Sequence, residues 1–221
     1  MLMKAVIFDL DNTLYDAEQY FSGAFAEISE YLSEKYSVNR SEVYKRLMKL
    51  WREKTSMYAY LFNDLLDSFN IKNELNNVIR LFNEFNGQLE TYPDVIPTIR
   101  ELKKRDYKLG IITDGNVKRQ KRKIQILKIA DFFDVVMYTK EFRCRKPSHI
   151  PFLKALEKLN IDSQNAFYVA DNPKVDFEGA KKVGIRTIRI FRGEFKDIPS
   201  NEYIDFEINS LTELLKIVSE D

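Results

Sequence analysis

Residues 4–15 read KAVIFDLDNTLY, and this stretch decides the fold. Its apolar run, Ala5–Phe8, is too short for a helix and lacks the polar alternation of a half-exposed strand. Such runs are typical of strands buried on both faces of a parallel sheet. The run stops at Asp9, and Asp11 follows two positions later, so in an extended chain both carboxyl groups can face the same space. The stretch therefore predicts a buried strand that carries two carboxylates at its end.

Similar apolar runs rich in β-branched residues recur further along the chain. They are Lys108–Thr113, Asp134–Tyr138, Ala166–Ala170 and Arg186–Ile190. Amphipathic stretches of helical length lie before or between them: Val95–Lys104, Val117–Lys128, Ile150–Leu159 and Val175–Val183. Alternating strands and helices favour crossover connections and an open sheet covered on both faces. We therefore predict the α/β class, with a Rossmann-like open parallel sheet as the core.

The segment 16–89 breaks this alternation, because it contains no convincing strand. Apolar residues recur in it at helical spacing, as Tyr20 and Ala24 do near its start. We predict an all-helical subdomain at 16–89, inserted into an α/β core that residues 1–15 and 90–221 form. The aromatic residues of the helical stripes are expected to form the core of this subdomain and not a ligand site.

The composition limits the partners and the compartment. The 221 residues carry a formal net charge of +1, so no overall charge favours a nucleic acid or a membrane surface as partner. Cys144 is the only cysteine, which excludes an intrachain disulfide and fits a reducing compartment. The first apolar run is too short for a signal peptide or a membrane span. We expect a cytoplasmic protein without nucleic-acid or membrane partners, and the sequence leaves its oligomeric state open.

Three further places join the first strand as candidates for chemistry. Thr113-Asp114-Gly115 ends a strand and opens a helix, where a hydroxyl group and free backbone N–H groups can bind an anion. An ordinary helix cap and turn is the alternative. Lys146 lies in the loop before a helix and could neutralise phosphate oxygens as a compact charge. Taken alone, a lysine in such a loop is more often an ordinary surface residue.

The last place follows the strand Ala166–Ala170. Asp171 lies one residue past this strand, and Mg²⁺ takes oxygen ligands, commonly one or two carboxylates with phosphate and water. Asp171 could thus complete a metal site that Asp9 begins. Asp176 lies at the start of the next helix, where an acidic residue can also simply stabilise the helix dipole. Because ligands bind outside the carboxyl ends of parallel strands, the four places together predict a phosphoryl-transfer centre at one edge of the sheet.

With these four motifs in order, DLDNT, TDGN, RKP and DNPKVD, the chain resembles the haloacid dehalogenase (HAD) superfamily over essentially its whole length. The resemblance implies a magnesium-dependent enzyme of the phosphatase branch, and the helical insertion looks like the type-1 cap of that superfamily. One departure is Ala170, which stands where the fourth motif usually carries glycine. A methyl group should be tolerable at that position.

The resemblance also implies a role for each motif residue. Asp9 would be the nucleophile and a metal ligand, and Asp11 the general acid and base, with its backbone carbonyl on the metal. To act as an acid near neutral pH, Asp11 would need a raised pKa, which its carboxylate neighbours could supply. Thr113 and Lys146 would bind the phosphoryl group, together with backbone N–H groups near Asp114 and Gly115. Asp171 would bind Mg²⁺. Asp176 would support the metal shell or Lys146.

The expected function is therefore the hydrolysis of a phosphomonoester of a small metabolite through an aspartyl-phosphate intermediate, with Mg²⁺ as the cofactor. The substrate stays open among sugar or triose phosphates, phosphoglycolate and nucleotides. Specificity is expected from the helical insertion, in particular from Trp51–Tyr60. Three alternatives remain: a 2-haloacid dehalogenase, which needs neither Mg²⁺ nor a protonated leaving group, a phosphomutase, and a non-catalytic binding protein with this fold.

Some conspicuous residues are expected to be ordinary. His149, the only histidine, and Cys144 are interpreted as surface or loop residues. The basic residues that follow the second motif are expected to form a solvated helix face. They are Lys118, Arg119, Lys121, Arg122 and Lys123.

Overall fold

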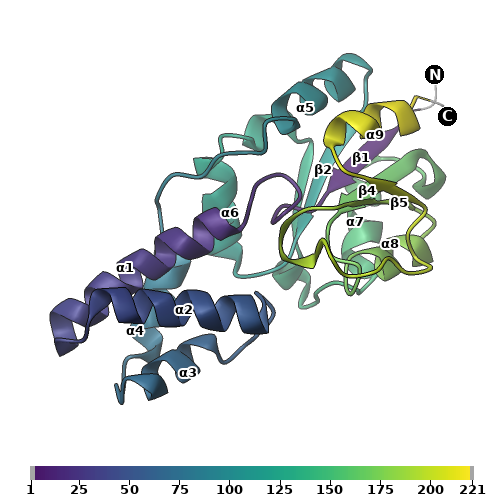
Figure 1. Cartoon of the computed structure of the whole chain (residues 1–221). Helices are drawn as coiled ribbons and strands as arrows, with labels where there is room; N and C mark the ends of the chain where they lie inside the picture. The colour runs from purple at the N-terminus through teal and green to yellow at the C-terminus, as the bar shows by residue number, and fades with distance from the viewer. Residues whose placement is uncertain (1–2, 220–221) are drawn as a thin grey trace. The chain divides into compact units, whose positions relative to one another are not determined.

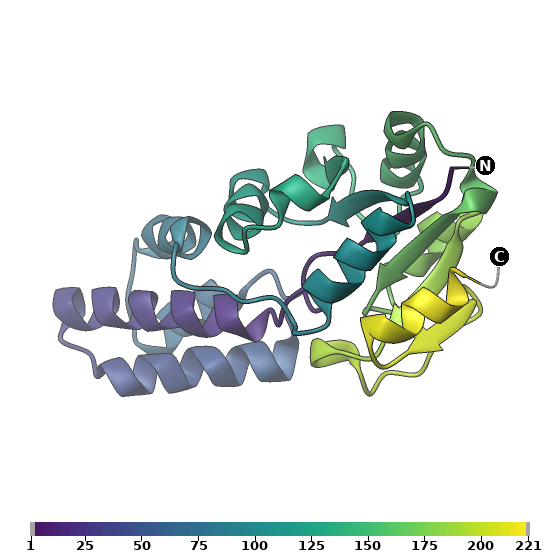
Figure 2. The ribbon, with the colours of Figure 1, turned by 90° about the horizontal axis from the view of Figure 1, so that it is seen from above.

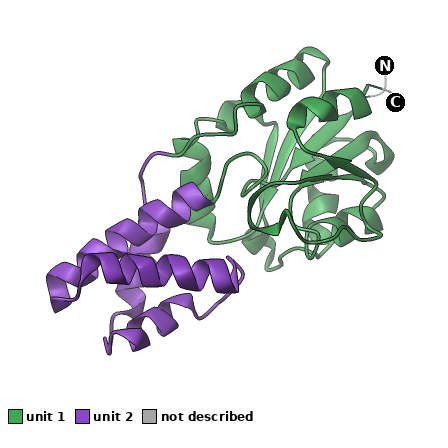
Figure 3. Ribbon diagram, viewed as in Figure 1, with its two compact units in different colours: residues 1–17, 89–221 green, residues 18–88 purple. Residues whose placement is uncertain are grey.

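The computed structural model describes residues 3–219, and the chain divides into two compact units. One unit consists of residues 1–17 and 89–221, and the other of residues 18–88 (Figure 3). The domain boundaries expected from the sequence, after residues 15 and 89, lie near these unit boundaries. The assignment of the units as separate domains stays a prediction.

The first unit (green in Figure 3) is built on a parallel sheet that has six strands in the described part of the chain (Figure 1). The strand order is β3-β2-β1-β4-β5-β6. This confirms the predicted α/β class with an open parallel sheet, although the sequence pattern did not predict the edge strand β6. The bounds are β1 Ala5–Phe8, β2 Lys108–Thr113, β3 Val135–Tyr138, β4 Ala166–Ala170, β5 Arg186–Ile190 and β6 Phe206–Ile208.

Helices cover both faces of this sheet (Figure 2). On one face α5 (Val95–Lys104) packs with α9 (Leu211–Ile217), and on the other α7 (Ile150–Leu159) packs with α8 (Phe177–Lys182). The helix α6 (Val117–Ile126) follows β2. The predicted helices there extend one or two residues beyond the ends of α6 and α8, which is the usual uncertainty of helix ends. No helix within residues 3–219 is long and apolar enough to cross a membrane.

The strand β1 lies in the middle of the sheet and is completely buried. None of the residues Ala5–Phe8 has exposed surface, and Phe8 pairs with Ile111 of β2 on one side and with Val169 of β4 on the other. Ile7 belongs to the apolar cluster that α7 and α8 share. Because both faces are covered, the strand has to be apolar throughout, and its first polar residue comes where the sheet ends.

The second unit (purple in Figure 3) is entirely helical. Its helices are α1 (Glu18–Tyr36), α2 (Arg40–Lys54), α3 (Leu61–Ser68) and α4 (Leu75–Glu84).

Aromatic rings form the core of this helical unit. The ring of Trp51 on α2 stacks on that of Phe21 on α1, with 4.9 Å between the centroids. Phe82 of α4 contacts rings from α1 and α3, and these are Tyr20, Phe21, Phe25 and Phe62. The aromatic stripes of the sequence therefore pack against one another.

Candidate active site

The motif residues gather where the central strands of the sheet end. Asp9 directly follows β1, Asp114 follows β2 and Asp171 follows β4, and these three strands are neighbours. The backbone N–H of Asp9 donates to the carbonyl of Val169 at 2.9 Å, so the chain is still held by the sheet at this point. The strand order switches direction between β1 and β4, and open α/β sheets bind ligands at such a switch point.

Lys146 brings two of these loops together inside the protein. Its Nζ lies 2.6 Å from Oδ1 of Asp9 and 2.6 Å from Oδ1 of Asp176, and 3.2 Å from the hydroxyl oxygen of Tyr168. All four side chains are buried. A lysine that is buried and bonded to two carboxylates is not an ordinary surface residue, and the structure thus removes that alternative for Lys146.

The pKa values of Asp9 and Asp171 are raised, first by burial and then by neighbouring carboxylates. Burial raises the pKa of Asp9 to about 7; Lys146 opposes this, and the charges of Asp176 and Asp11 add to it. Burial, followed by the charges of Asp176 and Asp9, holds the pKa of Asp171 well above its usual range. Lys146 therefore only partly compensates the negative charge that has been buried here, and a further cation would be bound favourably.

The donor set at this edge fits a hard divalent cation. The Oδ2 atom of Asp171 is buried and has no hydrogen-bond partner among the described residues. Within residues 3–219 no group of three or more His, Cys, Asp or Glu side chains is arranged to hold a metal ion. Asp9 and Asp171 could supply two carboxylate oxygens, and Mg²⁺ commonly takes its remaining oxygens from phosphate and water.

Asp11 is held by three donors from its own loop and from α6. Its Oδ1 accepts from the Tyr15 hydroxyl at 2.5 Å and from Nζ of Lys123 at 2.5 Å, and its Oδ2 accepts from Nε2 of Gln120 at 2.8 Å. Burial raises the pKa of Asp11, but the charge of Lys123 and the three hydrogen bonds outweigh it and lower this pKa to about 2.

Two expectations from the sequence are therefore wrong. The pKa of Asp11 is lowered and not raised, because Lys123 supplies a charge that the argument from neighbouring carboxylates left out. Lys123 does not belong to a solvated helix face, since only 3% of its side chain is exposed. A weak signal for this lies in the spacing of Gln120 and Lys123, which are three residues apart and so share one face of α6.

The second motif forms the loop that opens α6. The hydroxyl oxygen of Thr113 accepts from Nε2 of Gln120 at 2.6 Å. The carboxylate of Asp114 accepts from the Thr139 hydroxyl at 2.5 Å and from the backbone N–H of Lys146 at 3.3 Å, so this side chain organises the two loops. Gly115 has φ +121°, a conformation that other residues rarely adopt. The helix is capped by Asn116, whose side chain accepts from the N–H of Arg119.

Asp176 and Gly179 fix the fourth motif against the lysine loop. Besides its contact with Lys146, Asp176 accepts from the backbone N–H of Asn172 at 2.9 Å, and it makes no helix-cap hydrogen bond. A Cβ atom at Gly179 would lie 2.4 Å from the backbone oxygen of Pro147, so only glycine lets α8 approach this loop so closely. The two loops are thus joined by an ion pair and by direct backbone contact.

The remaining residues singled out in the sequence lie outside this cluster. His149 is exposed, and Cys144 is half-buried with its thiol near the carbonyl of Thr139. In the helical unit, Trp51 is buried and its ring stacks on that of Phe21 in the aromatic core. The role of Trp51–Tyr60 in specificity stays a prediction.

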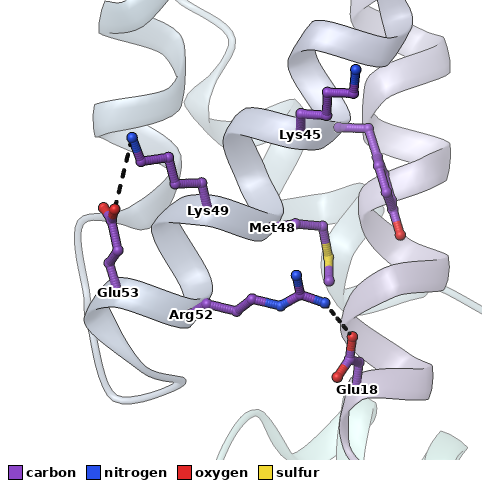
Figure 4. A pocket seen from close by; sticks show the side chains of 7 residues that line it. Glu18, Lys45, Met48, Lys49, Arg52 and Glu53 are labelled. Atoms are coloured by element: carbon purple, nitrogen blue, oxygen red, sulfur yellow. Dashed lines mark hydrogen bonds and ion pairs between the residues drawn. The ribbon is translucent and has the colours of Figure 1, made fainter.

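The helical unit has a pocket of its own between α1 and α2, with a volume of about 510 Å³ (Figure 4). Arg52 pairs with Glu18 at 2.9 Å, and Lys49 lies 3.8 Å from Glu53 (Figure 4). These ion pairs are exposed, and such pairs contribute little free energy. The pocket is lined by Glu18, Tyr44, Lys45, Met48, Lys49, Arg52 and Glu53.

Comparison with known proteins assigns the chain to one family and finds relatives that are named phosphatases. Residues 6–190 match the family model described as haloacid dehalogenase-like hydrolase. The chain is similar to the glyceraldehyde 3-phosphate phosphatase of Methanocaldococcus jannaschii, with 35% identity over 223 residues, which cover 98% of this chain and 97% of that protein.

Solved structures with the same fold include both phosphatases and dehalogenases. The chain superposes on a HAD phosphatase from Thermococcus onnurineus with a TM-score of 0.72 and 29% identity, covering 98% of each chain. It superposes on a 2-haloacid dehalogenase from Pseudomonas syringae with a TM-score of 0.70 and 28% identity, covering 99% of each chain. The fold alone therefore does not separate the two chemistries.

Proposed function

The chain belongs to the haloacid dehalogenase-like hydrolases, and from this membership we propose that it hydrolyses the phosphomonoester of a small metabolite. The family resemblance expected from the four motifs is confirmed, as is the prediction of a hydrolase of the phosphatase class. The observation that carries the proposal is the buried Lys146, which lies within 2.6 Å of both Asp9 and Asp176 beside the carboxylate of Asp171.

Asp9 is the proposed nucleophile. One of its carboxylate oxygens forms a bond to phosphorus, the bond between phosphorus and the alcohol oxygen of the substrate breaks, and Asp11 gives that oxygen a proton. Because Lys123 lowers the pKa of Asp11, this carboxyl group has to take up the proton in the substrate complex before it can donate it. Water then attacks the aspartyl phosphate, transfers its proton to Asp11, and releases Asp9 and inorganic phosphate. The position of both residues just beyond β1 supports this, since a strand end holds them on a rigid element.

Mg²⁺ is the proposed cofactor, held by the carboxylates of Asp9 and Asp171 and by the backbone carbonyl of Asp11. When bound, it would neutralise negative charge on the phosphoryl oxygens and orient the phosphoryl group for attack. The raised pKa values of Asp9 and Asp171 support a divalent cation at this place.

Other motif residues would bind the phosphoryl group. The hydroxyl of Thr113, the ammonium group of Lys146 and the backbone N–H groups near Asp114 and Gly115 provide hydrogen bonds and positive charge for its oxygens. Asp176 would hold Lys146 in place, which its 2.6 Å contact supports. The helical unit, residues 18–88, is proposed to act as the cap that selects the substrate.

Glyceraldehyde 3-phosphate is the first substrate to test, because the similar M. jannaschii protein is named for that activity. Sugar phosphates, phosphoglycolate and nucleotides complete the screen, and the proposed location of the enzyme is the cytoplasm. A 2-haloacid dehalogenase is the second candidate, which the similarity to the P. syringae structure favours. A phosphomutase or a binding protein would release no inorganic phosphate.

The test measures phosphate release from these esters with Mg²⁺ and halide release from 2-chloropropionate. We expect phosphate release that Asp9→Asn abolishes, and no halide release. Halide release without phosphate release would replace the proposal by the dehalogenase. Turnover of an ester that Asp9→Asn leaves unchanged would contradict the proposed nucleophile.

A further inference from the structure

Two buried side chains of α6 lie outside the four motifs and contact the motif carboxylate Asp11. Gln120 has 1% of its surface exposed and Lys123 has 3%. They are three residues apart on a helix, so their side chains leave it in nearly the same direction. Nε2 of Gln120 lies 2.8 Å from Oδ2 of Asp11, and Nζ of Lys123 lies 2.5 Å from Oδ1. The helix therefore engages both oxygens of one carboxyl group.

Burial of these two polar side chains costs free energy unless hydrogen bonds or an ion pair replace their lost contacts with water. An ammonium group removed from water loses hydration that an ion pair has to offset. The neighbouring Lys121 avoids this cost, because it is half-exposed and pairs with Glu141 at the surface.

Gln120 also links Asp11 to the second motif. The same Nε2 atom donates to the hydroxyl oxygen of Thr113 at 2.6 Å. A carboxylate can only accept hydrogen bonds, so the amide nitrogen and not the amide oxygen of Gln120 has to face Asp11. The carboxyl group of the first motif and the hydroxyl of the second are thereby set at a fixed separation by one side chain.

We propose that Gln120 and Lys123 are positioning residues that hold the carboxyl group of Asp11 in the orientation needed for proton transfer to the leaving oxygen. This inference rests on the proposed function, in which Asp11 acts on that oxygen. Tyr15 adds a third contact to Oδ1 from the same loop as Asp11, at 2.5 Å. Without the helix side chains the carboxyl group keeps only this local contact and can rotate away.

The proposal predicts an effect that depends on the leaving group. An alkyl phosphate such as glyceraldehyde 3-phosphate needs a proton on its leaving oxygen, whereas p-nitrophenyl phosphate does not. Displacement of a catalytic group by about 1 Å can cost on the order of 10²-fold in rate. Lys123→Met and Gln120→Leu should therefore lower kcat for the alkyl ester by roughly 10- to 100-fold with little change in KM. With p-nitrophenyl phosphate, phosphorylation of the enzyme, measured as the burst of nitrophenol, should keep its wild-type rate.

Two further measurements separate positioning from a structural role. In the Asp11→Asn background, Lys123→Met should cause no further loss with the alkyl ester, because the group that it positions is already gone. Lys121→Met is the matched control on the same helix and should behave as wild type with both esters. Equal losses for the alkyl ester and for the nitrophenol burst would overturn the proposal, as would additive losses in the double variant.

A crystal structure of each variant tests the orientation without turnover. We expect the Asp11 carboxyl group to occupy a second rotamer in Lys123→Met and in Gln120→Leu, and one rotamer in Lys121→Met. An unmoved Asp11 in both helix variants would overturn the proposal even if the wild-type protein hydrolysed neither ester. Absence of wild-type hydrolysis with a displaced Asp11 would instead count against the proposed function and leave the positioning contact supported.

Discussion

Replacement of Asp9 by asparagine should stabilise the metal-free protein at alkaline pH. In the folded chain burial raises the pKa of Asp9 from an ordinary value of 3.8 to about 7. Between these two values the folded state holds a proton that the unfolded state has released. Stability therefore decreases as the pH rises through this window, and it stays low above the folded pKa.

The size of the effect follows from the width of the window. The pKa difference of Asp9 is about three pH units, and each unit corresponds to about 1.4 kcal/mol, so the loss reaches about 4 kcal/mol near pH 8. Asparagine has nearly the same shape and does not titrate, so the variant lacks this loss. Its charge partner Lys146 keeps the contact with Asp176 at 2.6 Å and is not left unpaired.

The assay is urea denaturation with EDTA present, followed by far-UV circular dichroism at several pH values between 4.5 and 8. Circular dichroism is preferred over tryptophan fluorescence because the only tryptophan, Trp51, lies in the helical unit. The difference in unfolding free energy between Asp9→Asn and wild type should be small at pH 4.5 and grow toward about 4 kcal/mol at pH 8. The exposed Asp67 supplies the control, and Asp67→Asn should follow the wild-type curve. Parallel curves for Asp9→Asn and wild type over the whole range would refute the reasoning.

Three further predictions concern the metal, the two aspartates and the helical core. Phosphate release should stop in excess EDTA and return with Mg²⁺. The reason is that Asp9 and Asp171 bury negative charge that repels a phosphate ester when no metal ion is bound. Full activity in EDTA would contradict the metal site. Acid quench and intact-protein mass spectrometry during turnover of an activated ester should detect an adduct of about 80 Da, one phosphoryl group, on Asp11→Asn and none on Asp9→Asn. An activated ester needs no proton from Asp11 in the covalent step, whereas hydrolysis of the adduct needs Asp11 as the base; an adduct on Asp9→Asn would show a different nucleophile. Phe82→Ala should destabilise the helical unit by about 3–5 kcal/mol, since Phe82 is buried among four other aromatic rings. The control is Ile79→Ala, because Ile79 is an exposed residue of the same helix. The unfolding free energy of both variants is measured by Trp51 fluorescence in urea. If Phe82→Ala lowers it no more than Ile79→Ala does, the assigned core is contradicted.

The strands of the central sheet could be predicted because burial on both faces leaves a continuous apolar run. This held for β1, where no residue of Ala5–Phe8 is exposed. It failed for β6, since Phe206–Ile208 is three residues long and its first two are exposed. An edge strand of this kind is fixed by its pairing with β5, which no local pattern records.

The contacts of Asp11 could not be predicted for a related reason. Its partners Gln120 and Lys123 are more than 100 positions away in the chain, at separations of 109 and 112 residues. Lys123 lies in a run of basic residues, and composition alone assigns such a run to solvent. Only the rotation of α6 against the sheet decides which members of the run point inward, and that depends on packing across the whole unit.

Gly179 shows how a residue without functional groups can set the tolerance of the chain to mutation. A single methyl group at this position would meet the backbone oxygens of Pro147 and Ser148 at 2.4 and 2.8 Å, and backbone atoms cannot rotate aside as a side chain can. Alanine, which normally favours a helix over glycine, would here force α8 away from the loop that carries Lys146. In a deep mutational scan, position 179 should therefore tolerate as few substitutions as the charged motif residues. The cause is steric, because the backbone of the lysine loop leaves room for a hydrogen atom but not for a methyl group at this position.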